Sequence, residues 1–524
     1  MASLALAGAG CGGELAPAER AEEEKIRAPW ILTLERGTTR AGTLRAHRVV
    51  DGQVRHELLD PAAVMPLYWA PSARSLAYVT GLGQDARLMV RRFDGERWYP
   101  PASVTLPSGA PADGGLVQWS PRREQLLVRS SLRDAPELAL AMPRADGSIA
   151  TRSFDPSDLA SVRWASSGDR VVVTRLTPSG RRATVYLVSE GTDLATTPHE
   201  IAPPPGFTFD DIDSGHDETP MRDGEISPDG RWIVFVVRSG QDEATRALRA
   251  FSTSDGWPSR GLAGCPISRN AGAGVVCKPD GWVGSSTLLV RRFASDGGGL
   301  EAWTPAMNAR ADLGRVTRAS DRIGPGGTLL LVQEERSKAL SIVDFADPSA
   351  PVTTPVPGTG QPSFSGLTFS PRGRWLLLGH SNRASDEGWI DVLDLYAGPP
   401  WKTRELLRGA KDVGRRGAYW APGERSVLIL PQQEREAPRG TLVRLATGAT
   451  VPVEVSLQAA DARAFFWQWG GRIGPDDRTL ATARDGAMAL WRTDLPEESA
   501  VKLEVPMTAS LAWAPEPPSW APAR

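Results

Sequence analysis

Short apolar segments recur along the whole chain, and each is bounded by turns rich in Gly, Pro, Asp and Ser. Examples are residues 76–79, 126–128, 171–173, 233–236 and 376–378. Segments of this length, with stretches of period-two alternation and turn residues at their boundaries, predict β-strands rather than helices. The chain is therefore expected to be all-β and antiparallel.

A repeated motif stands before most of these segments. It consists of an aromatic residue or Ile, a small residue and usually Pro, then a polar turn, and the next strand begins seven residues after the first position. Copies begin at Trp69, Trp119, Trp164, Ile226, Trp282, Ile323, Phe369, Trp420, Ile473 and Trp513, and the Trp282 copy is one residue shorter. Successive copies are roughly 50 residues apart, a period that suits a four-stranded blade.

A further strand follows each of these strands, usually ending at a turn signal. The expected positions are 87–90, 138–140, 185–188, 248–251, 340–343, 390–393, 442–445 and 488–491. A single blade cannot bury both of its faces, so neighbouring blades must stack face to face. We expect the motif aromatics to fill the space between blades as core residues, and the Pro-containing turns to supply the fixed and positive φ angles of a tight turn.

Two copies carry a resemblance to a known family. The segments 227–235 (SPDGRWIVF) and 474–482 (GPDDRTLAT) resemble the repeat of TolB-type, WD-repeat-like β-propellers. The resemblance covers about residues 29–524 and implies an all-β propeller of four-stranded antiparallel blades. We expect residues 1–28 to be a signal- or lipobox-like segment followed by a charged tether. It implies little about function, because one fold hosts many unrelated activities.

The two ends of the chain complement each other. Residues 30–34 and 44–50 resemble outer strands without an inner partner, and the tail at 510–513 resembles an inner strand without outer ones. Together they would complete one blade and remove exposed sheet edges. We expect one ring of about eight to ten blades closed by the terminal strands; two tandem smaller propellers are the alternative.

Composition excludes several classes of function. Lys and Arg number 60 against 62 Asp and Glu, so the balance offers no electrostatic footprint for nucleic acid. No apolar stretch is long enough for a membrane-spanning helix. The five histidines form no HExxH motif, no Gly-x-Ser-x-Gly elbow occurs, and the repeats leave no room for a hydrolase domain.

The three cysteines indicate an exported protein. Cys265 and Cys277 enclose a short Gly-rich loop, which suits a disulfide in an oxidising compartment; two unrelated buried thiols are the alternative. Cys11 follows a short apolar run and resembles the lipidated cysteine of a bacterial lipoprotein signal, with a plain Ala/Gly-rich tail as the alternative. The expected location is periplasmic, tethered to the outer membrane through this lipid alone, or secreted.

One acidic segment is the candidate binding site. Asp210, Asp211, Asp213, His216, Asp217 and Glu218 fall in the longest interval between motif copies, which we expect to be a connection before an inner strand. Alternate aspartates could offer oxygen ligands to Ca²⁺, although a solvated acidic loop is the simpler interpretation, and no other cofactor is expected. With the Cys265–Cys277 loop one blade later, this segment would form a rim for a partner or ligand.

Three functions remain open. The first is a non-enzymatic platform that binds a protein partner or ligand in the bacterial cell envelope, with function carried by its loops. The second is a cyclase- or lyase-type propeller enzyme that uses Asp211, His216 and an arginine at the channel mouth. The third is a metal-dependent glycan binder, which clustered exposed aromatic residues would support.

Overall fold

The computed structural model describes residues 30–513, apart from ten longer segments and several shorter breaks. The longer segments are 105–116, 130–137, 211–224, 240–245, 254–258, 267–275, 411–416, 431–438, 455–473 and 493–500. Across the described part the regular structure is almost entirely β-strand, with a single-turn 3₁₀ helix, η4 (Leu395–Ala397). In that part, no helix has the length and apolar character needed to cross a membrane.

The described strands form nine antiparallel sheets. Six have four strands: β7 (Val117–Trp119), β8 (Leu126–Arg129), β9 (Leu138–Pro143), β10 (Ile149–Phe154); β11 (Leu159–Trp164), β12 (Arg170–Thr177), β13 (Gly180–Val188), β14 (Thr196–Ile201); β20 (Val276–Val283), β21 (Thr287–Phe293), β22 (Gly299–Thr304), β23 (Ala309–Asp312); β24 (Val316–Ile323), β25 (Leu329–Glu334), β26 (Leu340–Asp344), β27 (Val352–Pro355); β28 (Phe364–Phe369), β29 (Trp375–Asn382), β30 (Glu387–Asp394), β31 (Thr403–Ala410); and β32 (Gly417–Trp420), β33 (Ser426–Leu430), β34 (Arg439–Arg444), β35 (Thr450–Glu454).

The other three sheets vary this plan. One has five strands: β15 (Phe207–Asp210), β16 (Glu225–Ile226), β17 (Trp232–Ser239), β18 (Arg246–Ser252) and β19 (Arg260–Pro266). One has three: β36 (Thr479–Arg484), β37 (Ala487–Arg492) and β38 (Val501–Pro506). The largest joins seven in the order β39 (Ser510–Trp513), β1 (Ile31–Arg36), β2 (Ala41–Val50), β3 (Gln53–Trp69), β4 (Ser75–Thr80), β5 (Arg87–Arg92) and β6 (Ala102–Ser103).

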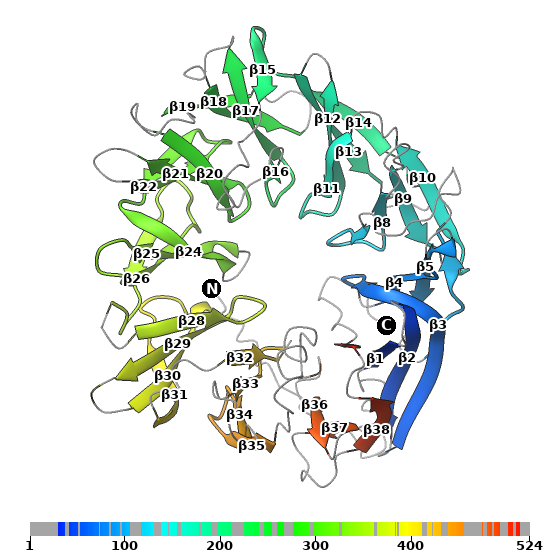
Figure 1. Cartoon of the computed structure of the whole chain (residues 1–524). Coiled ribbons are helices and arrows are strands. Elements are labelled where there is room, and N and C mark those ends of the chain that lie inside the picture. Colours follow the sequence, from blue (N-terminus) through cyan, green and yellow to red (C-terminus); the bar gives the residue numbers. More distant parts are fainter. Residues whose placement is uncertain are drawn as a thin grey trace, which may run out of the picture.

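Where the inner strand of a sheet is described, the motif marks the end of that strand. Its first residue is the last residue of an edge strand, as with Trp119 in β7, Trp164 in β11 and Phe369 in β28, and the next strand begins after the turn. Figure 1 shows the sheets arranged in chain order around a common centre, with these edge strands innermost. The strands expected directly after each motif turn, and the further strands expected after them, are present. The sheets are the blades of a β-propeller.

The seven-stranded sheet joins the two ends of the chain. Ile31 pairs with Trp513 and Leu34 with Ser510, so the predicted pairing of the terminal strands is confirmed. The sheet contains two blades that share β3, since residues 53–64 of β3 pair with β2 and residues 63–69 pair with β4. The closure of one ring by every blade, and the alternative of two tandem rings, remain matters of prediction.

The hydrophobic core lies between neighbouring blades. Leu88 of one blade packs with Val117 and Leu126 of the next, and Trp282 packs with Trp232 and Leu248 of the blade before it. Trp282 is therefore a core residue as expected, while Trp69, Trp119, Trp164, Phe369 and Trp420 are half-buried and pack against the edges of these clusters. The apolar area buried between blades is the main force holding one blade to the next.

Two motif tryptophans also make hydrogen bonds between blades. The indole N–H of Trp119 donates to the carbonyl of Tyr68 over 2.8 Å, and that of Trp164 donates to the carbonyl of Gln118 over 3.1 Å. Each acceptor is the residue directly before the motif residue of the preceding blade. A bond of this kind is worth about 1 kcal/mol and fixes the stagger of one blade on the next.

The motif turns contact one another from blade to blade. Ser120 donates through its hydroxyl to the carbonyl of Gly168 over 3.0 Å, and the backbone N–H of Asp229 donates to Ser285 over 3.0 Å. Gly168 has a φ of +72°, and a Cβ there would lie 2.8 Å from Ser120 Oγ. The glycine is therefore required both by the turn and by the close approach of the neighbouring turn.

Candidate functional site at the inner edge of the blades

The inner strand of one blade is divided in two. β15 pairs with β17 from Phe207 opposite Ser239 to Asp210 opposite Val236, and β16 resumes the same edge with Glu225 opposite Val234. Only Phe235 of β17 lies between the two points of pairing. Figure 1 shows β16 on the side of its blade that faces the common centre. Residues 211–224 therefore connect β15 to β16, and both ends of this connection lie at the inner edge of the blade.

This arrangement corrects one expectation. The acidic segment was predicted as a connection before an inner strand, but β15 already belongs to that strand, so the segment interrupts it. Asp210 is the last residue of β15. Asp211, Asp213, His216, Asp217 and Glu218 lie outside the described residues, and so does Cys11. Their roles remain predictions.

Other inner strands carry smaller irregularities. The pairing of β11 with β12 slips by one residue at Ala160, that of β28 with β29 at Ser365, and that of β20 with β21 at Asp280. β24 has a longer irregularity between Arg318 and Arg322. Bulges re-aim side chains and often lie beside functional sites. These four bulges are on inner strands, although outer pairs such as β18–β19 and β30–β31 also contain register shifts.

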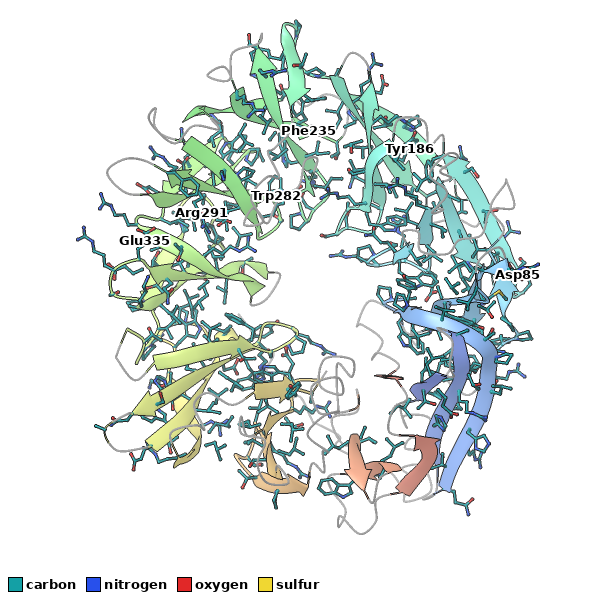
Figure 2. The ribbon with its side chains drawn as sticks, in the orientation of Figure 1. Asp85, Tyr186, Phe235, Trp282, Arg291 and Glu335 are labelled. Carbon is teal, nitrogen blue, oxygen red and sulfur yellow. The ribbon has the colours of Figure 1, made fainter. Side chains whose placement is uncertain are left out.

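The bulge at Asp280 holds an ion pair between a buried carboxylate and a half-buried arginine. Asp280 is 4% exposed, and its Oδ2 lies 3.2 Å from Nη2 of Arg291 on the neighbouring strand. Arg318 of the next blade donates to the Asp280 carbonyl. Gly281 follows with a φ of +113°, and the Arg318 guanidinium lies where its Cβ would be. Figure 2 labels Arg291 and Trp282 on this blade.

The Asp280 cluster is structural rather than an open site. Its carboxylate is neutralised by Arg291, and its carbonyl is bonded by Arg318, so the bulge connects the inner strands of two blades. Sequence reasoning missed it. The available signal was the Pro279–Gly281 turn tripeptide inside a strand, in the one motif copy that is a residue short.

The described histidines do not gather at one place. His47 and His56 face each other in the terminal sheet with ring centroids 6.4 Å apart, His199 is in the outer strand β14, and His380 is in β29. His380 is 2% exposed, stacks on Trp389 and lies 3.4 Å from Asp391 Oδ2. No group of three or more metal-ligating side chains occurs among the residues that the structure describes.

His47 is the histidine with the most perturbed titration. It is 4% exposed, and its Nε2 lies 2.7 Å from the hydroxyl of Thr33, which is itself fully buried in β1. Burial, together with the nearby cations His56 and Arg45, lowers the pKa of His47 from 6.5 to about 4. A neutral imidazole here therefore joins β2 to β1, the strand that pairs with β39.

Of the two cysteines in the predicted disulfide, only Cys277 has a side chain that the structure describes. Cys277 is fully buried in β20 and is disulfide-bonded. The side chain of Cys265, in β19, is not among those described, so its pairing with Cys277 remains a prediction. The loop between them connects an outer strand to the next inner strand, as expected.

No protein-family model and no curated protein sequence matches the chain. Among solved structures it is similar to the periplasmic gluconolactonase PpgL of Pseudomonas aeruginosa, with 18% identity, a TM-score of 0.29, and coverage of 73% of this chain and 96% of that one. It is also similar to dipeptidyl peptidase 4 of Porphyromonas gingivalis, with 10% identity, a TM-score of 0.43, and coverage of 81% and 64%.

TolB from Acinetobacter baumannii is a third similar structure, with 12% identity, a TM-score of 0.23, and coverage of 66% of this chain and 82% of that one. These similarities concern the fold alone. The named proteins include enzymes, and nothing in the likeness assigns an activity to this chain.

Proposed function

We propose that this chain is a non-enzymatic, exported β-propeller that binds a protein partner or ligand in the bacterial cell envelope. Its binding site would be the acidic segment that starts at Asp210 and includes Asp211, Asp213, His216, Asp217 and Glu218. The observation that carries the proposal is the division of the inner strand into β15 and β16.

A long insertion at this position needs an explanation beyond folding. The neighbouring blade forms the same edge with one continuous strand, β11, so the division is not needed to build a blade. The inserted residues contain five of the six candidate acidic and histidine residues. Loops on a rigid scaffold are where binding residues concentrate, and a dense group of carboxylates suits a basic partner surface or Ca²⁺.

The competing functions have less support in the described part of the chain. The histidines outside the acidic segment are distributed over three blades, so they supply no second half of a catalytic site. The exposed large aromatic side chains there are Phe293 and Tyr396, on different blades, rather than a cluster that would stack on a sugar.

The tether and the disulfide belong to the same proposal. Lipidation at Cys11 would hold the propeller at the outer membrane, and a Cys265–Cys277 disulfide would stabilise the neighbouring rim loop in the oxidising periplasm. Closing a loop of that size is worth about 3 kcal/mol.

A pull-down from cell-envelope fractions tests the proposed site. The full-length chain should capture a partner, and the double variant Asp211→Ala/Asp213→Ala should lose at least tenfold of that capture. Calorimetric titration of both proteins with CaCl₂ shows whether the segment holds Ca²⁺. The matched control is Glu335→Ala, an exposed carboxylate in the β25–β26 turn, which Figure 2 shows at the outer side. Unchanged capture and unchanged titration in the double variant would remove the segment from consideration.

A further inference from the structure

The first part of β3 is an outer edge of the fold. Residues 53–60 pair with β2 on one side, and β4 pairs only with later residues of the same strand. In the order of the seven-stranded sheet, no other described strand lies beside this part of β3. Figure 1 shows it at the outer side of the molecule, away from the common centre. Its outward backbone N–H and C=O groups are therefore a place where another extended segment can pair.

This edge lacks two of the features that usually prevent edge-to-edge pairing. From Gln53 to Leu58 the register with β2 continues without a bulge, and the prolines of β3, Pro61 and Pro66, come later. Leu58 is a large apolar residue and is 51% exposed. A regular, proline-free edge with an exposed leucine is suited to pairing with another strand.

The geometry of antiparallel strands limits how this edge can pair with a second copy of itself. Along β3, the backbone N–H and C=O groups of successive residues point alternately toward β2 and toward the outside. Two residues can be opposite each other in the new pair only if both point outward or both point inward. For two identical strands, this condition places one residue directly opposite its own copy. In the middle of the regular run, that residue is Arg55, His56 or Glu57.

Of these three registers, the one centred on His56 joins opposite charges. It places Arg55 of each copy opposite Glu57 of the other. In the same register, Val54 of each copy lies opposite Leu58. Centring on Arg55 or on Glu57 would place two identical charges opposite each other, which destabilises a strand pair. The His56 register therefore gains two ion pairs and two apolar pairs from one two-fold axis.

The side chains needed for the ion pairs are accessible. Arg55 is exposed, and its side chain makes no ion pair or hydrogen bond among the described residues. Glu57 lies 3.7 Å from Arg91 of its own chain, and its side chain remains 38% exposed. Because a carboxylate has two acceptor oxygens, Glu57 can bind a second arginine without releasing the first.

This self-complementary sequence is not a general property of outer strands. β10 carries Arg152 and has no acidic residue. In β31, Glu405 is already bonded by Arg408 of the same strand. Both strands lie at the outer edges of their sheets, so they serve as comparisons for β3.

We propose that two copies of this chain associate through the β3 edge, as an antiparallel two-fold pair centred on His56. The two seven-stranded sheets would then form one continuous sheet. Because antiparallel pairing reverses the strand direction, the motif turns of the two copies would point in opposite directions. A contact of this small size gives a reversible dimer rather than a permanent one. The association uses neither the acidic segment nor a lipid at Cys11, so it stands apart from the proposed function.

Sedimentation velocity over a range of protein concentrations tests the association. The full-length chain carries Cys11→Ser, so that neither a lipid nor a disulfide at this residue joins two copies. This protein should form a dimer. Arg55→Glu places two pairs of like charges across the contact and should weaken the dimer at least about tenfold. The matched control is Arg152→Glu, the same change at an exposed position of β10, which should leave the dimer unchanged.

Exchange of the two charges separates the contact from a loss of folding. The double variant Arg55→Glu/Glu57→Arg again places opposite charges face to face, so it should restore the dimer that Arg55→Glu loses. Far-UV circular dichroism reports whether each variant is folded. A starting protein that stays monomeric at every concentration would overturn the proposal. So would equal losses in Arg55→Glu and Arg152→Glu, or a folded double variant that does not dimerise.

The register has a test that does not depend on the charged variants. His56→Cys places a thiol opposite its own copy, where the Cα atoms of an antiparallel pair are about 5 Å apart. Mild oxidation should therefore join two copies through a disulfide. The matched control is Gln53→Cys, also exposed, whose two thiols would lie about 20 Å apart in this register. Equal cross-linking at the two positions would overturn the register. Absence of both the dimer and the cross-link would show that another segment covers the edge, and would overturn the proposal.

Discussion

Two neighbouring blades, β11–β14 and β15–β19, are built from the same repeat and differ at one place. In the first, the inner strand β11 pairs along its length with β12 apart from a one-residue slip at Ala160. In the second, the corresponding edge is made by β15 and β16, with residues 211–224 inserted between them. Both blades keep the motif turn, with Gly168 and Gly230 at a φ of +72°.

The difference shows where the fold is constrained and where it is free. At the motif end, described turns contact the next blade, as Ser120 does with Gly168 and Asp229 with Ser285, so sequence and geometry are fixed together. In the middle of the inner strand, the edge groups face the common centre rather than another strand, and an insertion costs only the pairing of one or two residues. Function can therefore enter a blade at the inner edge without disturbing the packing between blades.

Replacing a motif aromatic residue should give the largest loss in the free energy of unfolding. Trp164→Ala would lose the ring that packs against the preceding blade and the bond to the Gln118 carbonyl, and should lower the free energy of unfolding by about 4 kcal/mol. Urea denaturation measures it. Trp164→Phe is the control: it keeps a ring and loses the bond, and should cost about 1 kcal/mol. Equal losses in the two variants would contradict a packing role.

Strand ends were predictable because the constraint at the motif is local. An aromatic residue at a strand end, a small residue and usually Pro determine a turn and the strand that follows, as at Trp69, Trp119, Phe369 and Trp420. The pairing of β1 with β39 could be inferred because each end lacks what the other supplies.

The inner edge was harder to predict because its pairing is long-range. Residues 207–210 follow a Pro-Pro-Pro-Gly segment and precede acidic residues, so nothing local shows that they continue the strand completed at Ile226. The double role of β3 was hidden for a related reason. Pro61 and Pro66 suggest a break, but Pro61 lies at a register shift within the β2–β3 pairing, and Pro66 lies at a register shift within the β3–β4 pairing.

The seven-stranded sheet that joins both ends of the chain should differ from these two blades in its sensitivity to acid. In the unfolded chain His47 takes a proton near pH 6.5, whereas in the folded chain its pKa is about 4. Between these values the unfolded state binds more protons, so acidification destabilises the fold, by about 3 kcal/mol once the pH reaches 4. In His47→Gln this part of the loss should be absent.

Urea denaturation of wild type and His47→Gln at pH 7 and at pH 4 measures the difference. His56→Gln is the control, because His56 lies opposite His47 on β3 but is exposed. If the His47→Gln protein lost as much stability between the two pH values as the wild type does, the buried imidazole would not be the acid-sensitive group.

The two motif glycines should respond differently to the same change. A Cβ at Gly168 would lie 3.0 Å from the backbone N of Arg122, which cannot move freely, while at Gly230 it would meet the side-chain ends of Arg170 and Ser167, 2.6 Å away. Both sites also carry the cost of a positive φ, about 1 kcal/mol. Gly168→Ala should therefore cost about 2 to 3 kcal/mol, and Gly230→Ala about 1 to 2, by thermal or urea unfolding. The reverse order would show that side-chain displacement costs more than backbone movement.

Excision of the insertion should have the smallest effect on stability and the largest on binding. Joining Asp210 to Glu225 through a single glycine in place of residues 211–224 would restore one continuous inner strand, since the two ends pair with Val236 and Val234 and only Phe235 lies between. Loop-closure entropy changes slowly with length, so the free energy of unfolding should change by less than about 1 kcal/mol. Partner capture from envelope fractions should fall to background in the same protein. A control with residues 211–224 replaced by a Gly/Ser segment of equal length keeps the loop and removes its charges. If the excised protein failed to fold while the Gly/Ser protein folded normally, the insertion would be a structural requirement of this blade, and the contrast with β11 would no longer point to function.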